Sequence, residues 1–347
     1  MIPAEQETEP VFCQNLGFLM TYRCQVACPH CIIGAGPHRT EEMSEADILA
    51  WIEQAARVGR GRIKCICLTG GEPFCDLERL RQVSLFILAH GRVPTVVTNA
   101  FWAVSPEVAI ATLESLPALR VISISTDAHH LACIPMERVE NALHAVMKLN
   151  LHYNVAVCTE DESESRHVWL LERLSRLIPR DRIRVTITSP AGRAGSWADN
   201  SRFPISGERP RAACAGAHTP VVFPDGRVIA CIGPIIDIAG EHPLMLGNLH
   251  DQPLEQILEK AEMNPVLHIL RVWGPGKLCE ILEDQGMGGR LPQRFIKDSL
   301  CNLCYTILND VALCDALRSL AGDTGLMQKI AWGREFYLQE TAMSNRI

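Results

Sequence analysis

The sequence lacks the features that mark several large classes of protein. Its formal net charge is −7 and it has no block of consecutive basic residues, which argues against nucleic-acid binding. No apolar run approaches the roughly 18 residues of a membrane span. Its first ten residues, MIPAEQETEP, contain no basic segment and no apolar segment, so they form no secretory signal. We therefore expect a cytoplasmic protein with no nucleic-acid or membrane partner.

Cysteine, in contrast, is abundant. The 347 residues include 15 cysteines, and this odd number without an export signal argues against a disulfide framework. Clustered cysteines in a reducing compartment more often hold a metal. Cys65, Cys67 and Cys158 are expected to be exceptions, because each lies in an apolar stretch typical of a buried strand.

Six apolar, β-branched segments alternate with amphipathic segments of helical period up to about residue 190. Ser44 is the predicted N-cap of the first helix, with Asp47 three residues later. Repeated strand–helix units build a parallel sheet with right-handed crossovers. We therefore predict an α/β fold with a partial (β/α)6 TIM-type barrel. The predicted strands are 15–21, 63–70, 93–100, 119–126, 152–159 and 182–188.

A polar or cysteine-rich segment follows each of the first four predicted strands. In barrels of parallel strands, the chemistry takes place at the C-terminal ends of the strands. These four segments are therefore expected on one rim, where together they predict a site. They are the triplet Cys24, Cys28 and Cys31, then TGGEP at 69–73, TNA at 98–100 and STDAHH at 125–130.

The pattern changes after residue 195. Residues 196–213 are rich in Gly, Pro, Ser and Arg and read as a linker. A β-hairpin is predicted next, with PDG as its turn and with Cys214 and Cys231 on its two sides. Cys301 and Cys304 open an apparent helix. The predicted units are a tail at 1–12, the barrel at 13–195, the linker, a small β-hairpin plus helix domain at 214–314, and a helical segment at 315–347.

The triplet offers three thiolates where most four-coordinate metal sites use four. A [4Fe–4S] cluster held by Cys24, Cys28 and Cys31 has one iron without a protein ligand, and that iron binds a small molecule. The alternative is a zinc site completed by a residue such as His30 or His38. The position of the triplet on the rim favours the cluster.

The triplet after the first strand, with GGEP after the second, strongly resembles the radical S-adenosylmethionine (SAM) superfamily. The resemblance covers about residues 12–195. It implies that SAM binds the open iron. It also implies that an electron from the cluster cleaves SAM to methionine and a 5′-deoxyadenosyl radical, which takes a hydrogen atom from the substrate. The electron would come from an external donor of the flavodoxin or ferredoxin type.

The same resemblance assigns residues to SAM binding. A carboxylate and a close approach of the backbone suit the amino group of SAM. His30 departs from the family, which usually has an aromatic residue there, although histidine can also stack. Asp127 can equally be an ordinary turn or N-cap residue. The assigned residues are His30, Gly70, Gly71, Glu72, Ser125, Asp127 and Arg193.

The hairpin resembles the C-terminal extensions called SPASM and twitch domains, through Cys214, Gly226, Cys231 and residues 246–258. The shorter, twitch arrangement implies one fully ligated auxiliary [4Fe–4S] cluster. A zinc-bound hairpin is the alternative. Cys279 and Cys314 are assigned to neither cluster, and either can be a buried packing residue. Cys279 is also a candidate catalytic hydrogen-atom donor. The implied ligands of the auxiliary cluster are Cys214, Cys231, Cys301 and Cys304.

The resemblance implies a radical SAM oxidoreductase that modifies a ribosomally made peptide by epimerisation, crosslinking or oxidation at Cα or Cβ. Only about a dozen residues precede the first strand, so the N-terminal peptide-recognition domain of many relatives is not expected. This favours a short peptide or, alternatively, a small sugar-derived or aminocyclitol molecule. His129 and His130 either face the substrate or lie in a solvated loop. A zinc-binding scaffold without activity and an inactive recognition partner are further alternatives.

Overall fold

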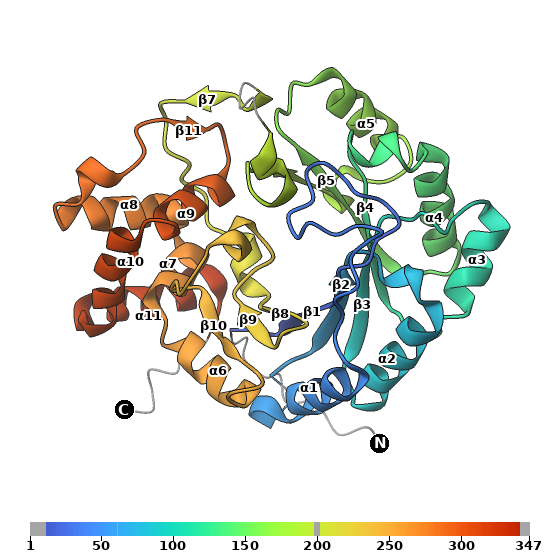
Figure 1. Cartoon of the computed structure of the whole chain (residues 1–347), viewed down its shortest axis with the longest axis horizontal. Coiled ribbons are helices and arrows are strands. Elements are labelled where there is room, and N and C mark those ends of the chain that lie inside the picture. Colours follow the sequence, from blue (N-terminus) through green and yellow to red (C-terminus); the bar gives the residue numbers. More distant parts are fainter. Residues whose placement is uncertain (1–11, 61, 198–201, 341–347) are drawn as a thin grey trace.

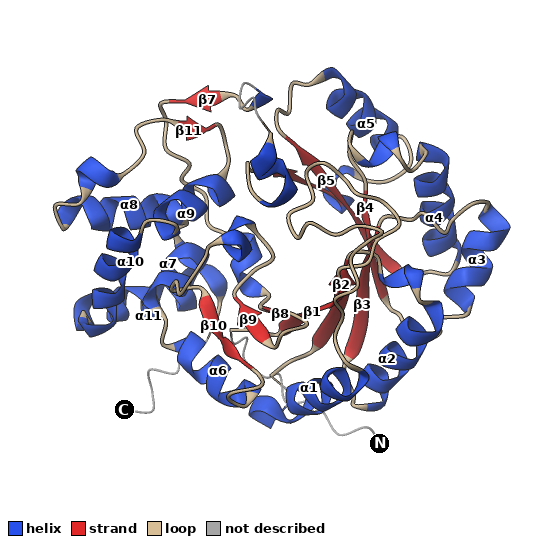
Figure 2. Cartoon of the chain, viewed as in Figure 1, coloured by secondary structure: helices blue, strands red, loops and turns tan. Residues whose placement is uncertain are grey.

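The computed structural model describes residues 12–60, 62–197 and 202–340. Its central feature is a nine-stranded sheet, which curves around an open middle with helices on its outer side (Figure 1, Figure 2). The strands of this sheet are β1 (Asn15–Thr21), β2 (Cys65–Gly70), β3 (Val93–Thr98), β4 (Val121–Ser125), β5 (His152–Thr159), β6 (Ile183–Ile187), β8 (Val221–Val222), β9 (Arg227–Ile229) and β10 (Met245–Asn248).

The strand order is β10-β9-β8-β1-β2-β3-β4-β5-β6, and β1 to β6 are parallel neighbours. All six predicted strands are therefore present, and the sheet stays open, so the predicted partial barrel is confirmed. The helices that follow these strands cover the outer face (Figure 1). They are α1 (Glu45–Arg57), α2 (Leu77–Ala89), α3 (Pro106–Glu114), α4 (Met136–Lys148) and α5 (Ser165–Ser175).

Side chains alternate between the two faces of the sheet, as the two-residue period of a strand requires. In β2, Ile66 and Leu68 are fully buried, whereas Cys65 and Cys67, which alternate with them, are partly exposed. The helices have matching apolar stripes. In α1, Ser44 is the N-cap, and its hydroxyl accepts a hydrogen bond from the amide of Asp47, as predicted.

The hairpin joins this same sheet instead of forming a separate small layer. β8 pairs in parallel with β1 through Gly17 and Val221, and the amide of Gly17 donates to the carbonyl of Pro220 at 2.8 Å. A Cβ at Gly17 would lie 3.0 Å from a methyl carbon of Val221, so the glycine permits the close approach. The sheet therefore runs across the predicted boundary between barrel and C-terminal part.

The C-terminal part is otherwise helical and lies opposite α3 to α5 (Figure 1). The predicted linker includes β7 (Ile205–Ser206), which pairs with β11 (Phe295–Ile296). No single described helix has the length and apolar character to cross a membrane, although the bent pair 300–308 and 311–322 meets the length and composition test. The helices are α6 (Leu254–Glu262), α7 (Pro265–Val272), α8 (Pro275–Asp284), α9 (Leu300–Leu308), α10 (Val311–Arg318) and α11 (Thr324–Leu338).

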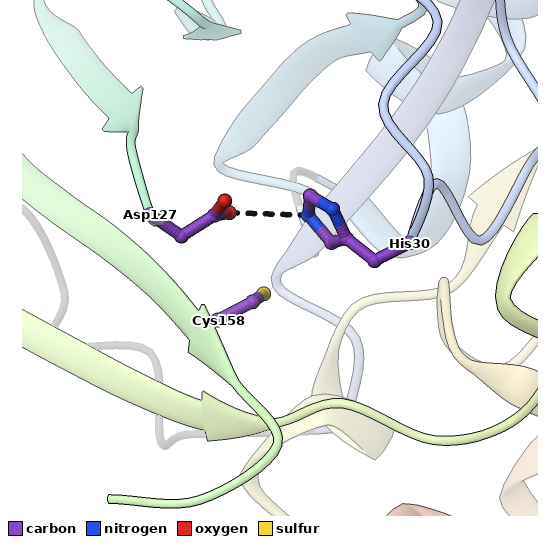
Figure 3. A group of neighbouring side chains, drawn as sticks. All are labelled: His30, Asp127 and Cys158. Atoms are coloured by element: carbon purple, nitrogen blue, oxygen red, sulfur yellow. Dashed lines mark ion pairs between the residues drawn. The ribbon is translucent and has the colours of Figure 1, made fainter. Parts of the chain in front are cut away.

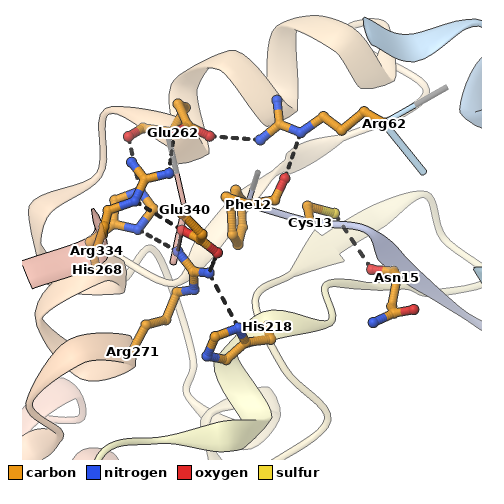
Figure 4. A network of polar contacts seen from close by, with 10 residues as sticks. All are labelled: Phe12, Cys13, Asn15, Arg62, His218, Glu262, His268, Arg271, Arg334 and Glu340. Atoms are coloured by element: carbon orange, nitrogen blue, oxygen red, sulfur yellow. Dashed lines mark hydrogen bonds and ion pairs between the residues drawn. The ribbon is translucent and has the colours of Figure 1, made fainter. Parts of the chain in front are cut away.

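A buried network of charges joins the C-terminal helices to the start of the chain (Figure 4). Arg271 of α7 has a fully buried side chain and pairs with Glu340, which also pairs with Arg334 of α11. Glu262 of α6 pairs with Arg334 and with Arg62 at 2.7 Å. The Arg62 guanidinium also donates to the carbonyl of Phe12 at 2.5 Å, next to β1. Each buried charge therefore has a partner of opposite sign.

Candidate functional site

A cavity of about 270 Å³ opens at the C-terminal ends of β2 to β6, on the rim predicted from the sequence. One wall is the loop after β1, with Cys24, Cys28 and Cys31. Residues 232–234 and Cys301 line the same cavity. A single cavity therefore touches the triplet and one member of the second cysteine set.

The glycines of TGGEP allow the end of β2 to press against the segment that leads into the triplet. A Cβ at Gly70 would lie 2.3 Å from the carbonyl oxygen of Thr21, and a Cβ at Gly71 would lie 2.1 Å from that of Arg23. Both glycines line the cavity. Only residues without a side chain fit between these backbones, which explains the glycine pair physically.

Arg193 lies behind the triplet loop. Its guanidinium donates to the carbonyls of Cys28 at 2.5 Å and Ala35 at 2.6 Å, and its amide donates to the carbonyl of Cys31 at 3.0 Å. The preceding Gly192 has φ of +59°, and a Cβ there would lie 2.4 Å from the carbonyl oxygen of Ile32. Arg193 therefore holds the loop in shape, while its predicted contact with SAM stays untested.

Glu72 is 1 % exposed and lies beneath the cavity wall. Its carboxylate accepts hydrogen bonds from the Thr98 hydroxyl at 2.9 Å and from the amides of Asn99 at 2.7 Å and Phe74 at 3.1 Å. Burial raises the pKa of Glu72 to about 7, although these donors counteract the rise. The carboxylate thereby ties the β2 loop to the end of β3.

Asp127, just after β4, is 1 % exposed and contacts two histidines, of which Figure 3 shows His30. Its carboxylate lies 3.1 Å from Nε2 of His30 and 2.6 Å from Nδ1 of His130. Burial favours a higher pKa for Asp127, but hydrogen bonds from His130 and His30 outweigh it and hold the pKa well below its usual range. Burial likewise opposes charge on His130, yet Asp127 and Cys28 raise its pKa well above 6.5.

The two histidines after β4 are engaged in contacts and do not form a solvated loop. His129 stacks on the His30 ring, with centroids 4.7 Å apart, and its Nε2 lies 2.7 Å from a carboxylate oxygen of Glu160. His130 lines the cavity, as does Ser125 at the end of β4. His30 also lines the cavity, and its buried Nδ1 has no hydrogen-bond partner among the described residues.

Cys158 lines the cavity, whereas the sequence predicted only a buried strand residue at this position. Its thiol lines the cavity at the end of β5 and lies within 4.8 Å of the ligand atoms of both His30 and Asp127 (Figure 3). Burial raises the pKa of Cys158 to about 12. Its position at the end of the fifth strand, on the rim already recognised for the first four, was the available signal.

The second cysteine set also comes together in space. Cys231 and Cys304 are partly buried, and burial together with neighbouring cysteines of the set raises the pKa of each well above 9. Cys214 and Cys301 are the neighbours that both share. The hairpin and the start of α9 therefore bring four thiols to one place.

The donor atoms of the two cysteine sets suit the metal groups expected from the sequence. Each set consists of thiols alone, and thiolates are the usual ligands of iron–sulfur clusters and also bind zinc. The triplet borders a cavity, as a cluster with an open iron requires. The residues present therefore fit the expected clusters, and zinc stays the alternative.

Cys279 and Cys314 lie apart from the cavity. Cys279 is fully buried within α8, and burial raises its pKa to about 11. Cys314 is 2 % exposed, and its thiol donates to the carbonyl of Leu308 at 3.0 Å. Neither residue lines the cavity in the part of the chain that the structure describes. The expectation that Cys279 donates hydrogen to a substrate stays a prediction.

Comparison with known proteins gives consistent results. The family model "Radical SAM superfamily" matches residues 18–159. The putative peptide biosynthesis protein YydG of Bacillus subtilis (strain 168) is 26 % identical over 295 residues, which cover 83 % of this chain and 89 % of YydG.

Two solved structures of anSMEcpe share the fold at low identity. The native form with bound AdoMet and Cp18Cys peptide has a TM-score of 0.51 and 15 % identity. The match covers 89 % of this chain and 99 % of the anSMEcpe chain. The hexahistidine-tagged form with bound AdoMet has a TM-score of 0.50, 13 % identity and the same coverage. The chain therefore carries a radical SAM domain, at residues 18–159.

Proposed function

We propose that this radical SAM enzyme modifies a peptide, by epimerisation, crosslinking or oxidation at a Cα or Cβ carbon. The observation that carries the proposal is the similarity to YydG, which is named a putative peptide biosynthesis protein and is matched over most of both chains. The anSMEcpe structure with a bound peptide shares the fold. The cavity touched by both cysteine sets supplies a place for the reacting part of the peptide.

In this proposal Cys24, Cys28 and Cys31 hold a [4Fe–4S] cluster, and the cluster with SAM supplies the hydrogen-abstracting chemistry. His30, Gly70, Gly71 and Ser125 line the cavity and would contact SAM. The other three residues predicted to bind SAM act from behind the walls: Glu72 fixes the β2 loop, Asp127 orients two histidines, and Arg193 holds the triplet loop.

Cys214, Cys231, Cys301 and Cys304 would hold a fully ligated auxiliary [4Fe–4S] cluster. Such a cluster has no open iron, so its role is electron transfer. Because Cys301 borders the same cavity as the triplet, an electron that leaves the substrate would enter the auxiliary site directly from the cavity. An external donor of the flavodoxin or ferredoxin type would supply electrons to the enzyme.

Co-expression with each short open reading frame next to the gene tests the proposal. Peptides are compared by mass spectrometry, with a triple Cys24, Cys28 and Cys31→Ala variant as control. Epimerisation leaves the mass unchanged in H2O and adds one solvent deuterium in D2O, whereas crosslinking or dehydrogenation removes two hydrogens. SAM cleavage that responds only to small sugar-like molecules, with every peptide unchanged, would contradict a peptide substrate.

A further inference from the structure

One thiol in the cavity belongs to neither predicted cysteine set. Cys158 precedes the last residue of β5, and its sulfur lies within 4.8 Å of the facing atoms of His30 and Asp127 (Figure 3). Cys158 lines the same cavity as the triplet and Cys301. Among the described residues, it is the only cysteine outside both sets that lines the cavity.

A neighbouring side chain indicates independently that a ligand occupies this space. Thr188 follows β6, where its amide donates to the carbonyl of Thr159 at 2.8 Å and so keeps it beside the end of β5. Thr188 is 8 % exposed and lines the cavity. Its hydroxyl has no hydrogen-bond partner among the described residues. A buried hydroxyl without a partner is costly, and a polar group of a ligand in the cavity would satisfy it.

The chemistry of a thiol suits hydrogen-atom transfer. An S–H bond is weaker than the C–H bonds of most carbon-centred products, so a carbon radical takes hydrogen from a nearby thiol readily. The transfer needs the protonated thiol, and a cysteine with its ordinary pKa of about 8.5 is mostly protonated at neutral pH. Thiolate ligands of a metal have no hydrogen to give, and this excludes the triplet and the second set from the role.

We propose that Cys158 donates a hydrogen atom to a carbon-centred substrate radical in this cavity. The Cys158 S–H bond breaks and a C–H bond forms on the substrate. The remaining thiyl radical takes one electron from the one-electron reductant of the enzyme and one proton from solvent. The peptide thus keeps its mass, as in an epimerisation. The assignment rests on the proposed radical SAM function and makes Cys158 a catalytic residue in it.

The chain offers matched controls for this assignment. Cys67 lies on β2, is partly exposed and does not line the cavity, so Cys67→Ser tests the general effect of removing a sheet thiol. Cys279→Ser tests the rival donor in α8. Serine preserves the size of cysteine closely, but its O–H bond is too strong to give up hydrogen to an alkyl radical.

The first experiment needs no peptide. Reconstituted enzyme is incubated anaerobically with SAM and dithionite in D2O, and the 5′-deoxyadenosine formed is analysed for deuterium. Wild type and the two control variants should give labelled product, because Cys158 lines the cavity and its S–H exchanges to S–D in D2O. Cys158→Ser should lose the label while retaining wild-type iron content and the wild-type change in the electron paramagnetic resonance spectrum on SAM binding.

A second readout concerns the protein itself. The nitrone spin trap DMPO, added during the reaction, should become attached to Cys158 in the peptide mass map of the wild-type enzyme. Attachment to Cys279, or deuterium labelling that survives in Cys158→Ser, would overturn the assignment. Absence of any SAM cleavage in the wild type would instead overturn the radical SAM function on which the assignment rests.

Discussion

The segment of Gly192 and Arg193 contacts both the loop that carries the triplet and the segment after Cys231. The three hydrogen bonds of Arg193 end on carbonyls of the loop that carries the triplet. The amide of Gly192 donates to the carboxylate of Asp237, in the segment that follows Cys231. The position of the triplet thiols therefore depends on a residue that does not contact the expected cluster.

Arg193→Met keeps much of the side-chain length and removes the charged donors. We predict that the variant folds but retains less iron on the triplet, because the carbonyls of Cys28 and Ala35 lose their partners. Each lost hydrogen bond to a charged group costs about 1.5–3 kcal/mol. Iron analysis and the rate of cluster loss on mild chelation measure the effect. Arg23→Met, which removes an exposed arginine next to Cys24, is the control and should leave iron retention unchanged.

Glu72 lies beneath the cavity wall, and both of its carboxylate oxygens accept hydrogen bonds. Glu72→Gln turns one oxygen into an NH2 group that faces a donor, either at Asn99 or at the Thr98 and Phe74 pair. We predict a loss of about 1–3 kcal/mol in the free energy of unfolding. We also predict weaker SAM binding with iron content unchanged, measured by equilibrium dialysis and iron analysis. Unchanged SAM affinity would contradict the role of Glu72 in fixing the β2 loop beside the SAM site.

At the scale of elements, the close approach of β2 to the loop after β1 creates the cavity rim. Gly71 has no positive φ, so only its contact with the carbonyl of Arg23 forbids a side chain. We predict that Gly71→Ala displaces the triplet loop and lowers iron occupancy, because a Cβ at 2.1 Å forces one backbone to move. Gly289→Ala is the control, since nothing lies within 4 Å of a Cβ there. Equal iron content in both variants would argue against this packing.

The same elements show how far sequence reasoning reaches. The six parallel strands were predictable because apolar, β-branched segments alternate regularly with amphipathic helical segments in residues 15–188. The rim residues followed from strand ends alone. Pairing between β8 and β1 was not predictable, because it depends on packing of Gly17 against Val221 across about 200 residues. Cys158 was missed because a thiol on the open face of a strand has the same local sequence as a buried one.

At the scale of the whole molecule, the charge network of Figure 4 fixes the C-terminal helices to the base of the barrel. His268 lies within it, 0 % exposed. Arg271 can only donate, so Nδ1 of His268 accepts from it at 2.9 Å, and Nε2 then donates to the carbonyl of Glu262. Burial, followed by the charges of Arg334 and Arg271, holds the pKa of His268 well below 6.5.

This histidine makes the stability of the protein depend on pH. Unfolding raises the pKa of His268 toward 6.5, so the unfolded chain binds one more proton below that pH. We predict that stability falls as the pH drops below about 6.5, by up to about 1.4 kcal/mol per pH unit from this residue. Thermal unfolding between pH 5 and pH 7 should show a shallower slope for His268→Gln than for wild type. Equal slopes would contradict the assignment of a neutral His268.

Iron and sulfide content per chain, after anaerobic purification and reconstitution, tests the central claim most directly. The wild type is compared with a triple Cys24, Cys28 and Cys31→Ala variant. Two four-iron clusters predict about eight irons in the wild type and about four in the variant. About four irons that fall to none would leave the radical SAM domain without the auxiliary cluster. Zinc in place of iron would contradict the account.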